Sequence, residues 1–211
     1  MTKDIHLVFH RRGLRSNIEV DLCADCPRND DRGCCGFYSP VFYPTDLVYL
    51  KLNRPDLIDL IFSLPRLTIL DASVTLNSEP DGAEGFHCQF HRKNGGCELI
   101  MLERESVCRH FVCLGIGWER EDALQPWKDF FDRLTDFEIN LNNELAARIK
   151  ARGLSLRKPE DRKEILHLLT EWTNPAFFSA IPDAVLDQTG LPEKQAFTLQ
   201  RSLTFGNEWI L

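Results

Sequence analysis

Cysteine is the residue whose placement in this sequence calls for a chemical explanation. All eight cysteines fall in two patches: Cys23, Cys26, Cys34 and Cys35 in the first, and Cys88, Cys97, Cys108 and Cys113 in the second. Free cysteine is normally scattered through a protein as a small core residue, whereas clustered thiolates are typical ligands of zinc and of iron–sulfur clusters. The pattern therefore predicts that all eight cysteines are metal ligands.

The spacing within each patch supports this interpretation. Cys23 and Cys26 form a CxxC pair, which brings two sulfurs to one side of a tight turn. Cys34 and Cys35 are adjacent, so their side chains point in different directions, and only one of the two needs to be a ligand of the same metal. The Gly95–Gly96 step before Cys97 permits the positive φ angles with which a chain folds back on a metal.

The sequence leaves two metal cofactors open. The CxxC pair and the Cys35-Gly36-Phe37 step are typical of zinc knuckles, whereas the Cys26-Pro27 step resembles the cysteine-proline step of ferredoxins. Zinc and an iron–sulfur cluster are therefore both predicted cofactors, with a slight preference for the cluster.

Four further side chains lie beside the predicted ligands. His87, His91 and His110 are candidates for a mixed cysteine and histidine site, although a histidine that is merely exposed or donates to a sulfur is the simpler interpretation. Arg109 follows Cys108 directly. Four thiolates around one zinc ion leave a net charge of about −2, which needs a cation or hydrogen bonds when partly buried. We therefore predict that Arg109 binds the cofactor.

The order of the cysteines resembles a known family. The pattern CxxC, then CC, then Cys-x-Phe, a further Cys, Cys-Arg-x-Phe and a last Cys is similar to the CxxCxxxCC (YkgJ-type) zinc- or iron-chelating domains. The resemblance covers roughly residues 20–115, with Phe90 and Phe111 as the matching aromatic residues. It implies a chelating role for the eight cysteines, and through flagellin lysine N-methylase, which carries a similar cluster, it implies a methyl-transfer role as an alternative.

Composition and charge limit the partners that we expect. The chain has 211 residues, 43% hydrophobic and 27% charged, and a formal net charge of −7. That charge argues against nucleic acid, because affinity for phosphates depends largely on lysine and arginine. No stretch approaches 18 apolar residues, and the first residues lack the features of a signal peptide. We therefore predict a cytoplasmic protein without a membrane partner, in which the cysteines stay reduced.

The hydrophobic pattern predicts an α+β protein, in which a small strand-and-loop cysteine-rich region (residues 1–118) packs on a mainly helical region (residues 119–211) and shares one core with it. Residues 5–9 and 18–22 alternate as a hairpin that leads into Cys23, and residues 67–70 and 74–76 predict short strands. Helices are expected from Pro44, with Thr45 as its cap, and from Pro55, over residues 127–149 and from Pro159, with shorter ones from Pro182 and Pro192. Residues 77–85 are expected to form a polar loop.

These observations predict a metal-binding protein that holds zinc or an iron–sulfur cluster, with redox or electron-transfer use if the metal is iron. Two alternatives stay open. One is a metal-containing enzyme, such as a protein methyltransferase, and the other is an interaction module stapled by zinc.

Overall fold

The computed structural model describes residues 2–23, 35, 38–81, 85–92, 96–113, 116–180 and 190–202. Helices and small antiparallel sheets occur together, and helices dominate the second half, so the predicted α+β class is confirmed. Within this part of the chain, no helix combines the length and apolar character needed to cross a bilayer.

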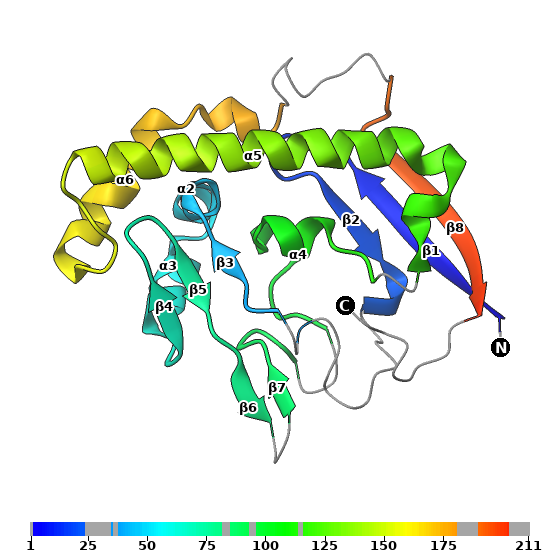
Figure 1. Ribbon diagram of the computed structural model, residues 1–211, viewed down its shortest axis with the longest axis horizontal. Coiled ribbons are helices and arrows are strands. Elements are labelled where there is room, and N and C mark those ends of the chain that lie inside the picture. Colours follow the sequence, from blue (N-terminus) through cyan, green and yellow to red (C-terminus); the bar gives the residue numbers. More distant parts are fainter. Residues whose placement is uncertain are drawn as a thin grey trace.

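The elements follow one another along the chain with the labels of Figure 1. They are β1 (Thr2–His10), β2 (Asn17–Val20), η1 (Asp21–Cys23), β3 (Val41–Phe42), α2 (Pro44–Asn53), α3 (Pro55–Ser63), β4 (Leu67–Ile69), β5 (Val74–Leu76), β6 (Glu79–Asp81), β7 (Gly85–His87), η2 (Met101–Glu103), α4 (Ser106–His110), η4 (Trp118–Arg120), η5 (Asp122–Leu124), α5 (Gln125–Ala151), η6 (Pro159–Asp161), α6 (Arg162–Trp172), η7 (Pro175–Phe178) and β8 (Lys194–Ser202).

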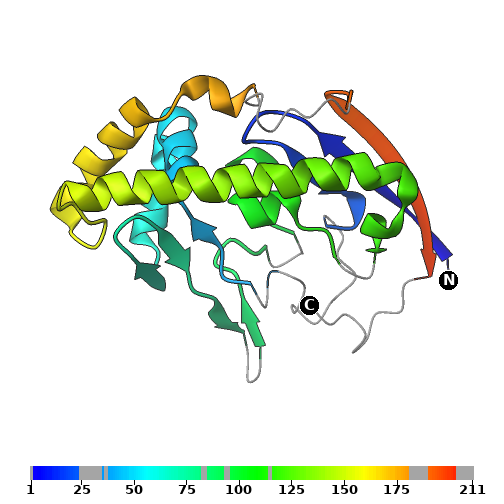
Figure 2. The same ribbon diagram turned by 45° about the horizontal axis from the view of Figure 1, so that its top comes forward.

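The long helix α5 runs along the molecule and connects its two ends (Figures 1 and 2). Its first half packs with β1, β2 and β8 in one hydrophobic cluster, where Trp127 stacks on Phe9 with ring centroids 5.2 Å apart. Its second half packs with α2, α3, β5 and α6 in another cluster, through Leu145 and Ile149. Each cluster therefore contains residues from both sides of the predicted boundary at residue 118.

The first sheet has the strand order β2-β1-β8. The predicted hairpin is confirmed: β1 and β2 pair antiparallel, and η1 follows directly and ends at Cys23. The predicted helix after Pro192 is wrong, because residues 194–202 form β8, which pairs antiparallel with the whole of β1. Along β8, exposed residues alternate with half-buried or buried ones, and Leu199 is buried in the core beneath the sheet. This burial pattern has the period of two of a strand rather than the period of 3.6 of a helix. The start of the other short helix, Pro182, lies outside the described residues.

The second sheet, β3-β5-β4, contains both of the strands predicted between residues 67 and 76. Helix α2 begins at Pro44 as predicted, but its N-cap is Tyr43 rather than Thr45, and the carboxylate of Asp46 accepts a hydrogen bond from the Tyr43 N–H at 3.1 Å. Part of the predicted loop at residues 77–85 is instead the strand β6, which pairs with β7 in a small hairpin. Cys88 follows the end of β7 directly.

Gly13, in the turn between β1 and β2, provides a test of this packing. Its φ is +55°, and a Cβ there would lie 2.3 Å from the Phe177 carbonyl oxygen, which also accepts the Leu14 N–H. Gly153 has a similar φ of +71° with open space around it. We expect Gly153→Ala to cost about 1–2 kcal/mol, the price of the backbone conformation alone, and Gly13→Ala to cost at least about 1 kcal/mol more because of the clash. Urea unfolding of both variants checks this, and equal losses would contradict it.

Candidate metal centre

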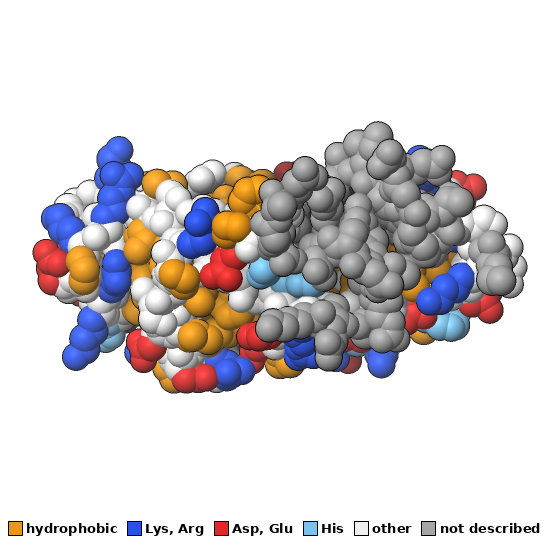
Figure 3. Space-filling view, turned by 90° about the horizontal axis from the view of Figure 1, so that it is seen from below, with side chains coloured by type: hydrophobic (Ala, Val, Ile, Leu, Met, Phe, Trp, Pro, Cys, Tyr) orange, Lys and Arg blue, Asp and Glu red, His pale blue; other side chains and the backbone are white. Residues whose placement is uncertain are grey.

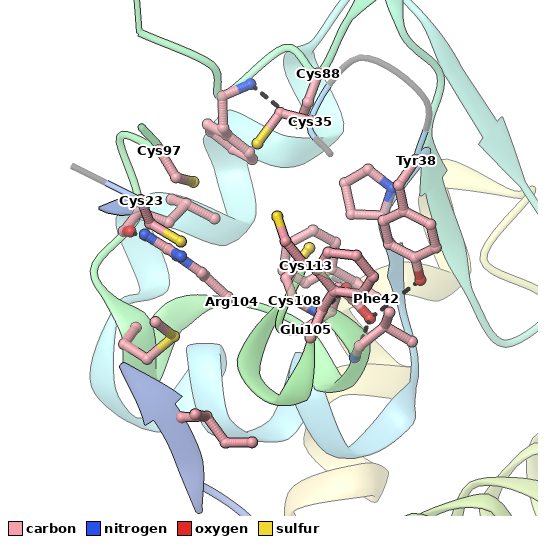
Figure 4. Close-up of a pocket in the computed structure, with 17 residues that line it drawn as sticks. Cys23, Cys35, Tyr38, Phe42, Cys88, Cys97, Arg104, Glu105, Cys108 and Cys113 are labelled. Atoms are coloured by element: carbon pink, nitrogen blue, oxygen red, sulfur yellow. Dashed lines mark hydrogen bonds between the residues drawn. The ribbon is translucent and has the colours of Figure 1, made fainter. Parts of the chain in front are cut away.

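One cavity of about 390 Å³ gathers cysteines from both patches. Six cysteine side chains lie on its wall and, in Figure 4, surround a common space. The full set of lining residues is Ile18, Cys23, Cys35, Tyr38, Pro40, Phe42, Cys88, Phe90, Cys97, Leu99, Met101, Arg104, Glu105, Val107, Cys108, Phe111 and Cys113. Between the cysteines the wall is mostly apolar and aromatic, and Cys88 is buried while the other five cysteines are half-buried.

A 3-10 turn positions Cys23, and a backbone hydrogen bond joins Cys35 and Cys88. Cys23 ends η1, which continues from β2, so the edge of the first sheet places this sulfur. Cys35 and Cys88 come from stretches far apart in the sequence, and the Cys88 N–H donates to the Cys35 carbonyl oxygen at 2.7 Å. This backbone contact joins the two cysteine patches directly.

A tight loop holds Cys88 and Cys97. The His91 N–H donates to the Cys88 carbonyl at 2.8 Å, and the Phe90 N–H lies 3.5 Å from Cys88 Sγ, which it approaches as a donor. Residues His91 and Cys97 form an isolated antiparallel bridge, and Gly96 has φ +78°. The left-handed backbone expected of the glycine pair therefore occurs next to Cys97.

The short helix α4 carries Cys108 and leads to Cys113. Glu105 is its N-cap, and its carboxylate accepts hydrogen bonds from the Cys108 N–H at 2.7 Å and the Val107 N–H at 2.9 Å. Such a cap satisfies two backbone donors that the helix itself cannot. Cys108 is thereby fixed at the start of the helix, on the wall of the cavity.

The cavity disfavours charge on an isolated thiol. Burial raises the pKa of Cys108 well above its usual value, and the nearby Glu105, Cys88 and Cys97 raise it further. Burial also raises the pKa of Cys97, although Arg104 and Arg92 lower it in part. A cation that binds several sulfurs at once would remove this penalty, since thiolates are the form that coordinates metals.

Glu105 and Tyr38 form a second polar group on the wall. The Tyr38 hydroxyl donates to Glu105 Oε2 at 3.5 Å. Burial raises the pKa of Glu105 to about 7, with a further contribution from Asp46, while its hydrogen bonds with Cys108 and Val107 oppose the rise. Burial and the nearby Glu105 likewise raise the pKa of Tyr38. Both groups are positioned to exchange hydrogen bonds with whatever fills the cavity.

Arg109 does not lie on this wall, and its contact with the cofactor stays a prediction. Its fully buried guanidinium binds Glu138 at 2.8 Å and donates to the carbonyl oxygens of Leu14 at 2.5 Å and Ser16 at 3.2 Å. Its Nε donates to the Arg104 carbonyl at 3.1 Å. On α4 the Arg109 side chain points to α5 and the β1–β2 turn, away from the face that carries Cys108, so the hydrogen-bonding capacity predicted for sulfur is used by protein oxygens.

The three histidines also lie off the lining of the cavity in the described part of the chain. The rings of His87 and His91 have centroids 5.9 Å apart, and histidine side chains are visible together on the lower face of the molecule (Figure 3). The ring of His110 contacts Phe131 and the Ser16 carbonyl oxygen, and burial lowers its pKa to about 4. A neutral His110 therefore donates its Nε2 proton to that carbonyl.

Six of the predicted ligands are thus brought together, and Cys26 and Cys34 lie outside the described residues. Among the residues that the structure describes, no group of three or more histidine, cysteine, aspartate or glutamate side chains is arranged to hold a metal ion. Of the adjacent pair, Cys35 lies on the cavity wall, whereas Cys34 is outside the described residues.

Two functional candidates on the wall, Arg104 and Glu105, were not among the predicted site residues. Glu105 stands three residues before Cys108, which is the spacing of an N-cap and the amide that it caps, but glutamate is not one of the usual N-cap residues, so the sequence contained no capping signal. The sequence did not show which of Arg104 and Arg109 faces the cavity. Arg104 lies four residues before Cys108 and Arg109 directly after it, so both are close to this cysteine.

Comparisons with models of known protein families, with curated proteins and with solved structures found no match to this chain.

Proposed function

We propose that this protein binds a metal cofactor through cysteine thiolates in the cavity, and that the cofactor is an iron–sulfur cluster rather than a single zinc ion. The observation that carries the proposal is the convergence of six cysteines, from stretches of chain far apart in sequence, on one mostly apolar space. Chance burial of reduced thiols has no reason to bring every described cysteine to the same wall.

The size of the cavity favours a cofactor of several atoms. Zinc–sulfur bonds of about 2.3 Å define a sphere of only about 50 Å³ around a single ion. The cavity measures about 390 Å³ and has cysteines on several sides. An iron–sulfur cluster is larger than a single ion and its cysteine ligands lie farther apart, so it fits a cavity of this size better.

The local backbone also suits thiolate ligands. The contact from the Phe90 N–H to Cys88 Sγ supports a negative sulfur, because hydrogen bonds to a charged group favour its charged form. The proposed ligands are Cys23, Cys35, Cys88, Cys97, Cys108 and Cys113, together with Cys26 and Cys34 from the sequence pattern. A bound iron–sulfur cluster would supply one-electron transfer.

Anaerobic purification followed by reconstitution with ferrous iron and sulfide tests the proposal. We expect iron and acid-labile sulfide in comparable amounts, together with visible absorption from charge transfer between sulfur and iron. The same protein loaded with zinc alone should show no such absorption. A preparation that binds neither metal under these conditions would refute the proposal, and one that binds only zinc would refute the iron–sulfur assignment.

Met101 offers a matched control for these measurements. Its thioether lies on the same wall, but it is a weak acceptor and does not form a thiolate. Leucine has a similar volume, so Met101→Leu should change the packing little. We expect this variant to keep the iron and sulfide content of the wild-type protein, and a large loss would show that cavity shape rather than thiolate ligation controls binding.

A further inference from the structure

The wall of the cavity carries one cation among the described residues. Of the seventeen lining residues, Arg104 is the only lysine, arginine or histidine, and Glu105 is the only carboxylate. Arg104 lies on the side of the cavity where Figure 4 places Cys23 and Cys97. It is half-buried, so its charge is less screened than that of a fully exposed arginine.

The side chain of Arg104 is held in place from its own loop. Its Nε donates to the Leu99 carbonyl oxygen at 3.1 Å, which fixes the plane of the guanidinium next to Cys97, two residues before Leu99. The two terminal nitrogens of the guanidinium then extend beyond this contact. A planar fork of this kind can donate to sulfur or to other anionic atoms in a defined direction.

The backbone of Arg104 is held by two buried arginines. The Arg104 carbonyl oxygen accepts from Arg15 Nη1 at 3.1 Å and from Arg109 Nε at 3.1 Å. Arg15 in turn binds Asp46 at 3.0 Å and Arg109 binds Glu138 at 2.8 Å, and all four of these side chains are buried. Arg15, Asp46, Arg109 and Glu138 therefore form an ionic cluster behind the wall. This cluster positions the peptide bond that joins Arg104 to Glu105.

We infer that Arg104 makes the cavity selective for an anionic cofactor and controls how firmly that cofactor is retained. The inference rests on the proposed function. Four thiolates with one zinc ion or one oxidised four-iron cluster carry a net charge of about −2, and a half-buried charge of this size needs a nearby cation. Arg104 supplies that cation on the side of the cavity that carries Cys23 and Cys97. The charged residue beside Cys108 is Glu105, a carboxylate, which cannot serve as the cation. Arg109 contributes through the hydrogen bond that its Nε donates to the Arg104 carbonyl oxygen.

The test compares three variants after anaerobic reconstitution with ferrous iron and sulfide. Arg104→Met removes the charge and keeps the length of the chain, and Arg104→Lys restores the charge without the fork. Arg92→Met is the matched control, because Arg92 is an exposed arginine of the neighbouring loop whose charge also acts on Cys97. The measurements are the rate of iron release to a chelator, the reduction potential and the thermal unfolding temperature.

We expect Arg104→Met to weaken iron retention by about 10- to 100-fold, as other changes next to metal ligands do. Its reduction potential should also fall, because loss of a cation disfavours the added electron. Arg104→Lys should recover part of both effects, and Arg92→Met should differ from wild type by less than about twofold, since exposed charges are screened. Equal retention and potential in wild type and Arg104→Met would overturn the inference while leaving the proposed function intact. A wild-type protein that binds no metal would overturn both.

Discussion

Changing Cys108 to serine is expected to leave the protein with less than about half of its wild-type metal content, since a ligand is lost from the site. The hydroxyl of serine is a harder and far less acidic ligand than a thiolate. Cys108 lies in the first turn of α4, where the Glu105 carboxylate caps its amide, so the backbone that carries this ligand is held in place. Iron and sulfide analysis after anaerobic reconstitution measures the loss.

The double variant Cys97→Ser, Cys108→Ser sharpens this test. The two thiols come from different segments of the wall, and Cys97 contributes to the raised pKa of Cys108. We expect essentially no bound iron in the double variant, with a folded protein by far-UV circular dichroism. Met101→Leu serves again as the control from the same wall. Wild-type metal content in Cys108→Ser would show that this cysteine is a buried thiol and not a ligand.

The same wall predicts a difference between the adjacent cysteines. Cys35 lines the cavity, and its carbonyl oxygen accepts the Cys88 N–H. We therefore expect Cys35→Ser to lower metal content as Cys108→Ser does. Cys34 lies outside the described residues, so the measurement on Cys34→Ser decides whether the pair supplies one ligand or two.

The sequence was sufficient for the elements with a strong period. The period of 3.6 in residues 127–149 and the alternation in residues 5–9 each predicted an element that the structure contains, α5 and β1. Alternation in residues 194–202 was equally present, but the proline at 192 resembled a helix start and the partner strand is more than 180 residues away. Long-range pairing of this kind leaves no local signal, so β8 was mistaken for a helix.

The candidate site was predictable only as to its cysteines. Clustered thiols are visible in any sequence, and six of the eight do share one cavity. The roles of Arg104 and Arg109 were not predictable, because Arg104 follows the short helix η2 and Arg109 belongs to the next short helix, α4, and no periodicity can be read over elements of three and five residues. Which charge faces the sulfurs is therefore a property of the fold and not of the spacing.

The largest effect on stability is expected from Arg109 itself, through the ionic cluster behind the wall. Arg109 and Glu138 are fully buried partners, and Arg109 also lies 3.8 Å from Asp46, which binds Arg15. Burial raises the pKa of Glu138, but Arg109 and His110 lower it, and the net shift is downward. Burial and the nearby Arg109 lower the pKa of Arg15 to about 10. Asp46 and Glu138 oppose that fall, so the charged state of the two guanidinium groups depends on the two carboxylates of the cluster.

Removing one charge leaves its partner buried and uncompensated. We expect Arg109→Met to lower the free energy of unfolding by about 3–5 kcal/mol, the range for breaking a buried ion pair. Three carbonyl oxygens, those of Leu14, Ser16 and Arg104, lose a donor at the same time. Lys128→Met breaks the exposed pair with Asp132 on α5 and should cost less than about 1 kcal/mol, which makes it the matched control.

A double-mutant cycle with Glu138→Gln separates the ion pair from the rest of the network. If the two charges stabilise each other, the loss in the double variant should be smaller than the sum of the single losses, by about 1–3 kcal/mol. Urea unfolding of metal-free protein gives all four free energies without a contribution from the cofactor. Strict additivity would show that Arg109 stabilises the fold through the carbonyl groups of the β1–β2 turn rather than through Glu138. In that case the position of Arg104 would depend on hydrogen bonds to neutral groups, and Glu138→Gln alone should leave iron retention unchanged.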